Sequence, residues 1–239
     1  MNNSEIKNIF WDLDGTLATW ESMLIVFHIS REYLSLFPAS CSFGKLFLGV
    51  ARAYTRMLRN YGPLNNDAFF NRTLAVSTGL KSHEIRELTV RMIESQKMAD
   101  IVNKFIVQIP EGLASVRKIA ESGKYHQLIA TNPIMPSRFN RMRLELAGYD
   151  TSMFDYITGS ENFFGQKKKS DYYRRLLDLT GFVPSECLMV GNDESKDLIA
   201  GEVGIKTFLL KTEYTIRSQK VSAEPDFSGD YSELNKMLE

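Results

Sequence analysis

The sequence predicts an α/β protein with a parallel β-sheet flanked by helices and interrupted by a helical insertion. Short apolar runs alternate with amphipathic helical patterns over most of the chain, as expected for βαβ units. Residues 18–107 break this alternation and show one helical pattern after another. We therefore expect a core domain made of residues 1–17 and 108–239, with an all-helical domain at 18–107 inserted after the first strand.

The expected strands are short and apolar, and they lie at residues 6–11, 127–130, 156–158, 187–190 and 207–210. Two amphipathic helices are expected between them, over 110–122 and 170–180. Gly123 and Gly181 follow these patterns directly, and glycine is the usual residue just past a helix end.

The insertion shows helical patterns over residues 23–37, 45–60 and 82–105. Pro38, the Gly62–Pro63 pair and Gly79 punctuate them, as expected for connections between helices.

Charge and apolar patterning argue against several partner classes. Lys and Arg total 29 and Asp and Glu total 29, so the net charge is zero. Such a balance offers no electrostatic basis for binding nucleic acid or an anionic membrane. No apolar run approaches the roughly 20 residues that a membrane-spanning helix needs, and the first residues lack the pattern of a signal peptide. We expect a cytoplasmic protein.

Asp12 and Asp14 stand two residues apart, directly after the first apolar strand and before Gly15. Alternate residues of a strand point to the same side, so the two carboxylates converge where the strand ends. A cation relieves their repulsion, and Mg²⁺ favours one or two carboxylates together with phosphate oxygens. One aspartate can then act as nucleophile and the other as general acid and base. A surface Asp-Gly turn is the alternative, whereas a calcium loop lacks its further ligands.

Three more polar clusters follow apolar strands: Thr131 with Asn132, the lysine run 167–169, and the pair Asp193 and Asp197. Taken singly, they are compatible with a turn, a solvated loop and a helix start. Together they indicate a phosphate and metal site, because the carboxyl ends of parallel strands meet at one edge of a sheet.

The segments "WDLDGTL", "LIATN" and "VGNDESKD" resemble, in this order, motifs of the haloacid dehalogenase-like (HAD) hydrolases. Most members of this family are Mg²⁺-dependent phosphatases with a Rossmann-like core. The resemblance covers about residues 5–16 and 110–210. It implies that Asp12 is the nucleophile, that Asp14 is the general acid and base, and that Thr131 binds phosphate.

The resemblance also implies that Asp12, Asp14 (through its backbone carbonyl) and Asp193 bind the metal, with Asp197 as a supporting acid. The insertion resembles the helical cap that closes over the site in many relatives.

Two departures from the family pattern concern the site. The third motif, usually Lys-Pro-x-Pro, lacks both prolines. Counting back from Tyr173 and Gly181 favours Lys167 as its lysine, with Lys169 next and Lys168 between them. In the fourth motif, Asn192 stands where many relatives have aspartate, and Asp193 takes over the expected metal role.

These observations predict Mg²⁺-dependent hydrolysis of a small phosphate monoester through an aspartyl-phosphate intermediate. A phosphomutase would share the same core residues, and a non-catalytic phosphate-binding or regulatory protein is the alternative from another class. A carbon–halogen hydrolase is disfavoured, because that branch needs neither the acid at Asp14 nor the metal.

Overall fold

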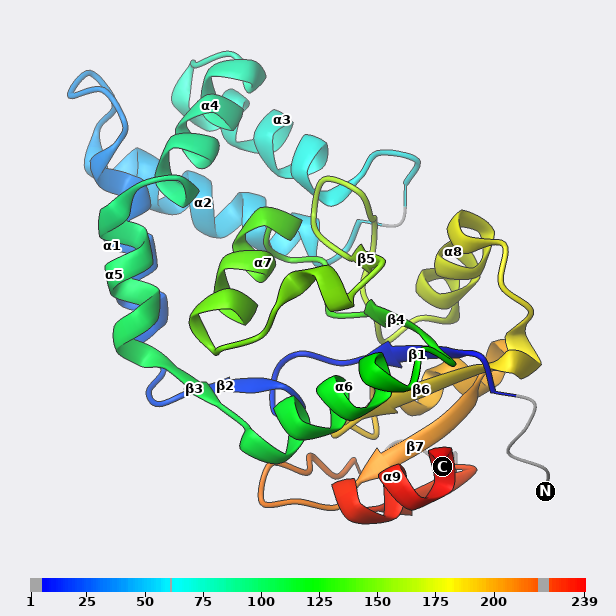
Figure 1. The fold of residues 1–239 in the computed structure, drawn as a ribbon. Helices are drawn as coiled ribbons and strands as arrows, with labels where there is room; N and C mark the ends of the chain where they lie inside the picture. The colour runs from blue at the N-terminus through cyan, green and yellow to red at the C-terminus, as the bar shows by residue number, and fades with distance from the viewer. Residues whose placement is uncertain (1–5, 61, 219–223) are drawn as a thin grey trace.

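A six-stranded parallel sheet forms the core of the protein (Figure 1). The sequence predicts a parallel sheet and five of its strands, and the sixth lies at Phe227–Gly229. The computed structural model describes residues 6–60, 62–218 and 224–239. In spatial order the strands are β5 (Tyr156–Ile157), β4 (His126–Ile129), β1 (Asn8–Trp11), β6 (Cys187–Gly191), β7 (Lys206–Leu210) and β8 (Phe227–Gly229). β1 therefore lies in the middle, between β4 and β6, and its two neighbours deliver their following loops to the same edge of the sheet.

Helices cover both faces of this sheet. α6 (Pro110–Ser122) and α9 (Tyr231–Leu238) pack on the face that includes Ile9 and Trp11. α8 (Ser170–Thr180) and the short 3-10 helix η4 (Leu198–Val203) pack on the face that includes Phe10. Successive residues of β1 point to opposite faces, and all four are buried: the polar Asn8 and the apolar Ile9, Phe10 and Trp11. α6 and α8 end at Gly123 and Gly181, as predicted, and both glycines are left-handed.

The helices of the insertion share an apolar cluster that also includes Phe139 from outside the insertion. The insertion contains α1 (Leu24–Ser35), α2 (Phe43–Met57), α3 (Asn66–Thr78), α4 (Ser82–Ile93) and α5 (Gln96–Phe105). Buried side chains from all of these helices pack together, among them Tyr33, Leu46, Leu74, Leu88 and Val102. Figure 1 shows the insertion beyond the carboxyl end of β1.

One expected helix of the insertion is two helices. The pattern over 82–105 is interrupted after Ile93, and α5 begins anew at Gln96. The hydroxyl of Ser95 accepts a hydrogen bond from the backbone N–H of Met98, at 3.1 Å. This N-cap gives the second helix a separate start.

A short antiparallel ribbon joins the insertion to the core. β2 (Ala18–Trp20) pairs with β3 (Ile106–Gln108), so the chain leaves and re-enters the core side by side. These residues are extended, whereas the sequence pattern predicts a helical region that includes 18–20 and 106–107.

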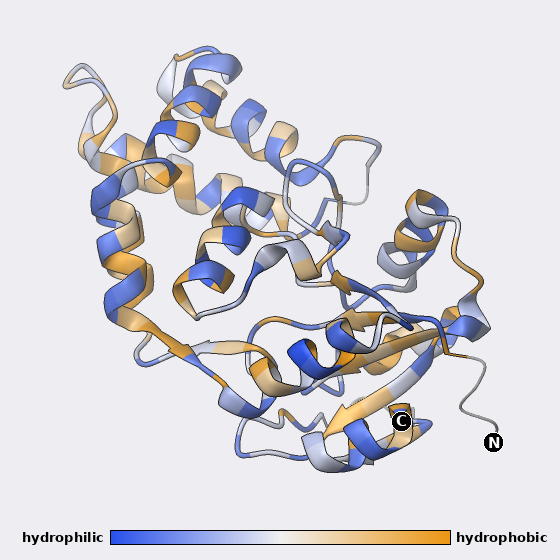
Figure 2. Ribbon diagram, in the orientation of Figure 1, coloured by the Kyte–Doolittle hydropathy of each residue, from blue (hydrophilic) through white to orange (hydrophobic). Residues whose placement is uncertain are grey.

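Figure 2 shows hydrophobic residues along most of the sheet, although β4 begins with the hydrophilic His126 and Gln127. The helices alternate between hydrophobic and hydrophilic residues. Among the described residues, no helix combines the length and the apolar character needed to cross a membrane.

Candidate active site

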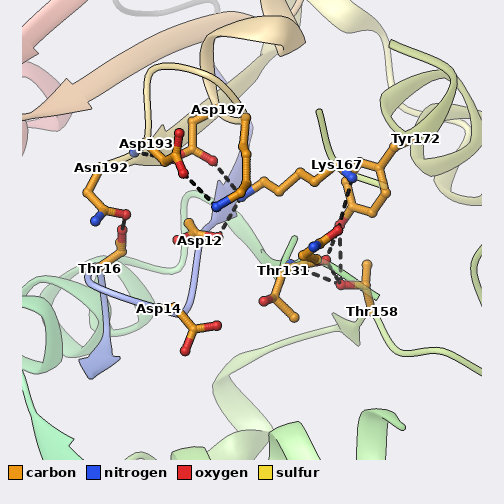
Figure 3. Close-up of polar contacts among 12 residues, drawn as sticks. Asp12, Asp14, Thr16, Thr131, Thr158, Lys167, Tyr172, Asn192, Asp193 and Asp197 are labelled. Carbon is orange, nitrogen blue, oxygen red and sulfur yellow. Dashed lines mark hydrogen bonds and ion pairs between the residues drawn. The ribbon is translucent and has the colours of Figure 1, made fainter. Parts of the chain in front are cut away.

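The loops that follow β1, β4 and β6 bring the predicted polar residues together (Figure 3). The backbone N–H of Asp12 donates to the carbonyl of Val190 at 2.9 Å, and the N–H of Ala130 donates to the carbonyl of Trp11 at 2.7 Å. These bonds extend the sheet pairing by one residue. They fix Asp12 beside the first residues of the two neighbouring loops.

Lys167 reaches into this edge of the sheet. Its side chain is fully buried, and its Nζ lies 2.6 Å from Oδ1 of Asp12 and 2.6 Å from Oδ1 of Asp197. Its backbone N–H donates to Oδ1 of Asn132 at 3.1 Å. Lys168 and Lys169 are exposed. Of the three lysines, Lys167 is thus the one that contacts the predicted nucleophile, and Asn132 holds it in position.

The pKa of Asp12 depends on opposing effects of burial and of neighbouring charges. Burial raises the pKa of Asp12 to about 7, although the ammonium of Lys167 acts in the opposite direction. The negative charges of Asp197 and Asp14 raise it further. The pocket therefore holds more buried negative charge than Lys167 neutralises, which favours an additional cation.

Asp197 connects Lys167 to the loop after β6. Its second carboxylate oxygen, Oδ2, accepts a hydrogen bond from the backbone N–H of Asp193 at 2.8 Å. This approach requires glycine at position 191, because a Cβ there would lie 2.1 Å from Oδ2 of Asp197. Asp197 precedes η4 but makes no side-chain capping bond to it. Its carboxylate instead pairs with Lys167 and accepts the hydrogen bond from Asp193.

Thr131 is held by its backbone. Its N–H donates to Oγ1 of Thr158 at 3.0 Å, and its carbonyl accepts from the hydroxyls of Thr158 and Tyr172 at 3.0 and 2.9 Å. Among the described residues, no hydrogen bond uses the hydroxyl of Thr131 itself. Sequence reasoning named neither Thr158 nor Tyr172 as a site residue; the only available signal was that Thr158 ends a predicted strand.

Asp193 is buried and surrounded by donors. Its Oδ1 accepts from the N–H and hydroxyl of Ser195, at 2.9 and 2.6 Å, and its Oδ2 lies 2.5 Å from Nζ of Lys196. Burial opposes the charge of Asp193, but the hydrogen bonds from Lys196 and Ser195 outweigh it and lower its pKa. Asp193 is therefore anionic and already paired with a cation that the sequence analysis had not singled out.

Asn192 faces the first motif rather than the lysine. Its Oδ1 accepts from the hydroxyl of Thr16 at 3.3 Å, and its Nδ2 donates to the carbonyl of Tyr214 at 2.6 Å. The amide packs so closely against Gly15 that a Cβ at that position would lie 2.3 Å from Nδ2. Because an aspartate could accept but not donate here, the structure gives a physical reason for asparagine at this position.

Asp14 has surroundings unlike those of Asp12. Its side chain is 53% exposed and points away from Lys167 (Figure 3). One carboxylate oxygen pairs with the guanidinium of Arg143, a buried residue of α7 (Ser137–Leu146). The same guanidinium lies 4.5 Å from the centre of the Trp20 ring. Sequence reasoning missed Arg143, since one arginine among several on a helix carries no signal of its own.

Mg²⁺ needs oxygen ligands. In the part of the chain that the structure describes, no three His, Cys, Asp or Glu side chains form a metal cluster. Mg²⁺ does not require one, because it binds through one or two carboxylates, water and phosphate oxygens. Asp12 and Asp193 supply two buried carboxylates from neighbouring loops. The ammonium of Lys196, held by Asp193, shows that this position accepts a cation. The residues fit Mg²⁺ provided that Lys196 moves away from Asp193.

A buried aspartate thus lies at the end of the central strand, in contact with a buried lysine. The sequence profile of the haloacid dehalogenase-like hydrolase family matches residues 9–210. The chain belongs to this family. No curated protein matches it at a significant level.

Solved structures of the same fold cover almost the whole chain. A 2-haloacid dehalogenase from Pseudomonas syringae is 17% identical, with a TM-score of 0.62 and 98% of each chain covered. A predicted phosphoglycolate phosphatase from Haemophilus somnus is 16% identical, with a TM-score of 0.58 and coverage of 98% and 99%. A haloacid dehalogenase-like hydrolase from Streptococcus pneumoniae is 18% identical, with a TM-score of 0.53 and coverage of 99% and 100%. These likenesses show the fold, including the inserted helical region.

Proposed function

We propose that this protein is a Mg²⁺-dependent phosphatase that hydrolyses a small phosphate monoester through an aspartyl-phosphate on Asp12. The observation that carries the proposal is a pair of aspartates with opposite environments. Asp12 is buried against Lys167, whereas Asp14 is half-exposed beside Arg143. Two carboxylates whose environments differ in this way suit two different roles, a shielded nucleophile and an acid that exchanges protons.

The first half-reaction transfers the phosphoryl group to Asp12. The hydroxyl of Thr131, the ammonium of Lys167 and the amide of Asn132 bind the phosphate oxygens. Because Lys167 holds Oδ1 of Asp12, Oδ2 attacks the phosphorus in line. The bond between phosphorus and the alcohol oxygen breaks, and Asp14 protonates that oxygen as it leaves.

The second half-reaction releases phosphate. Asp14, now a carboxylate, removes a proton from water, and the resulting hydroxide attacks the phosphorus. The bond to Asp12 breaks and the free enzyme is restored. Lys167 and Asp197 keep Asp12 in place through both steps, so the main contribution of the protein is positioning and charge neutralisation.

Asp12, the backbone carbonyl of Asp14 and Asp193 would hold the Mg²⁺. When bound, the metal supplies positive charge beside the phosphate oxygens. The helical insertion, residues 18–107, would act as the cap that covers the bound ester and reads the rest of the substrate.

Phosphate release from a panel of phosphomonoesters tests this proposal, with wild type and Asp12→Asn compared in Mg²⁺ and in EDTA. We expect turnover that Asp12→Asn and EDTA each abolish, while Lys168→Ala, a change at an exposed neighbour of the site, retains it. Analysis of the products of a sugar phosphate separates a phosphatase from a phosphomutase.

Carbon–halogen hydrolysis is the second candidate, because structures of haloacid dehalogenases share the fold. Asp14 argues against it. Halide release from 2-haloacids that persists in EDTA and in Asp14→Asn, without phosphate release from any ester, would overturn the phosphatase proposal.

A further inference from the structure

Arg143 is the only arginine or lysine for which the described residues show an ion pair with Asp14. It comes from α7, far from the first motif in sequence, and its side chain is only 5% exposed. A buried guanidinium beside a half-exposed carboxylate is an asymmetric pair: the cation is fixed by its surroundings, whereas the anion faces the solvent.

The other side of Arg143 is also occupied. Its guanidinium lies 4.5 Å from the centre of the Trp20 ring, within the range of a cation–π contact. Trp20 ends β2, the first strand of the ribbon that leads into the helical insertion. Arg143 thus lies between the predicted acid and the base of the insertion.

We propose that Arg143 is the positioning residue for Asp14, holding one carboxylate oxygen so that the other faces the leaving group and water, and that Trp20 fixes the guanidinium in this orientation. The inference rests on the proposed function, since it assigns a partner to the residue that would act as acid and base. A long arginine side chain alone would leave the carboxylate free to rotate. A guanidinium fixed by burial and by an aromatic ring restricts it, and positioning of this kind contributes directly to rate.

This role predicts a dependence on the leaving group. An alkyl phosphate needs protonation of its leaving oxygen. The p-nitrophenolate group of p-nitrophenyl phosphate, by contrast, leaves as a stable anion without protonation. kcat/KM reports the steps up to departure of the alcohol. We therefore expect Arg143→Met to lower kcat/KM for the alkyl ester by about 10- to 100-fold. For p-nitrophenyl phosphate we expect a change of less than about threefold, since the general acid contributes little there.

Three further variants complete the test. Arg143→Lys should restore part of the alkyl-ester activity, and Trp20→Leu should cause a smaller loss of the same kind. Arg141→Met is the control, because it removes a positive charge from the same helix at a residue that donates to Thr151 and not to Asp14. This variant should hydrolyse both esters as wild type does. An equal loss on both esters in Arg143→Met would show a merely structural role and overturn the inference.

Thermal unfolding separates this inference from the proposed function. In a double-mutant cycle of Asp14→Asn and Arg143→Met, a positioned pair gives Tm shifts that are not additive, and additive shifts overturn the positioning role. If wild type hydrolyses neither ester, the proposed phosphatase activity fails, and this cycle still decides whether Arg143 holds Asp14.

Discussion

The ammonium of Lys167 lies 2.6 Å from the carboxylate of Asp12, and no part of the lysine side chain is exposed to solvent. The same ammonium also lies 2.6 Å from a second carboxylate, that of Asp197. Burying one cation between two anions couples the stability of the fold to the chemistry of the site. Removing the cation leaves two buried carboxylates without their partner.

Lys167→Met should therefore impair both stability and activity. We expect the free energy of unfolding to fall by about 3–5 kcal/mol, as for one broken partner of a buried ion pair. We expect kcat/KM for phosphate release to fall by about 10²–10³-fold, because the developing phosphoryl charge loses a donor. Urea unfolding and steady-state kinetics measure the two effects.

Lys169→Met and Lys168→Met are the matched controls, since both lysines are exposed. Each should unfold like wild type and retain most of its activity. A loss confined to Lys169→Met would mean that the register of the third motif is displaced by two residues.

Lys196→Met should increase the apparent affinity for Mg²⁺. The ammonium of Lys196 occupies Oδ2 of Asp193, so it must leave before a metal binds there. We expect the Mg²⁺ concentration at half-maximal activity to fall about two- to fivefold, since a partly exposed ion pair contributes less than about 1 kcal/mol. Lys211→Met, at an exposed lysine outside the site, serves as control. Weaker Mg²⁺ binding in Lys196→Met would contradict competition and point to a supporting role instead.

The strands that form the site were predictable because burial on both faces leaves a plain apolar run. Most residues of β1 and β6 are apolar. β1 ends directly before Asp12, and β6 is followed by Asn192 and then Asp193. β8 is only three residues long and includes Ser228, so its sequence carries no comparable signal. β2 and β3 are equally short, and each becomes a strand only by pairing with the other across the whole insertion.

The same contrast holds within the site. The sequence predicts Lys167 by counting residues back from Tyr173 and from Gly181, the residue at which the helix ends. Such a count works because these positions belong to one continuous local segment. Arg143, by contrast, reaches Asp14 because α7 packs beside the loop after β1, and sequence spacing contains no record of that packing. Local patterns therefore indicated the residues at strand ends, whereas the residues that hold them from neighbouring helices required the folded structure.

Gly191→Ala should disrupt the link between Asp197 and Lys167. The added Cβ would lie 2.1 Å from Oδ2 of Asp197, so the carboxylate has to move. We expect a loss of about 1–3 kcal/mol in the free energy of unfolding, typical of overpacking, together with lower phosphatase activity.

Gly201→Ala is the matched control for this change, because the nearest atom to a Cβ there lies 4.0 Å away. It should leave unfolding and activity nearly unchanged. Equal behaviour of the two alanine variants would show that the carboxylate of Asp197 tolerates displacement.

Asn192→Asp tests which residue of the fourth motif provides the metal carboxylate. The substitution introduces the aspartate that many relatives have, but it removes the 2.6 Å donation from Nδ2 to the carbonyl of Tyr214. We expect a loss of about 1–3 kcal/mol in the free energy of unfolding, because the partly buried carbonyl of Tyr214 loses its donor.

Asp193→Asn should abolish Mg²⁺-dependent turnover. Since Asn192 faces Thr16 and Gly15, the double variant Asn192→Asp with Asp193→Asn should remain inactive when phosphate release is measured across a Mg²⁺ titration. Recovery of activity in the double variant would transfer the metal role to position 192.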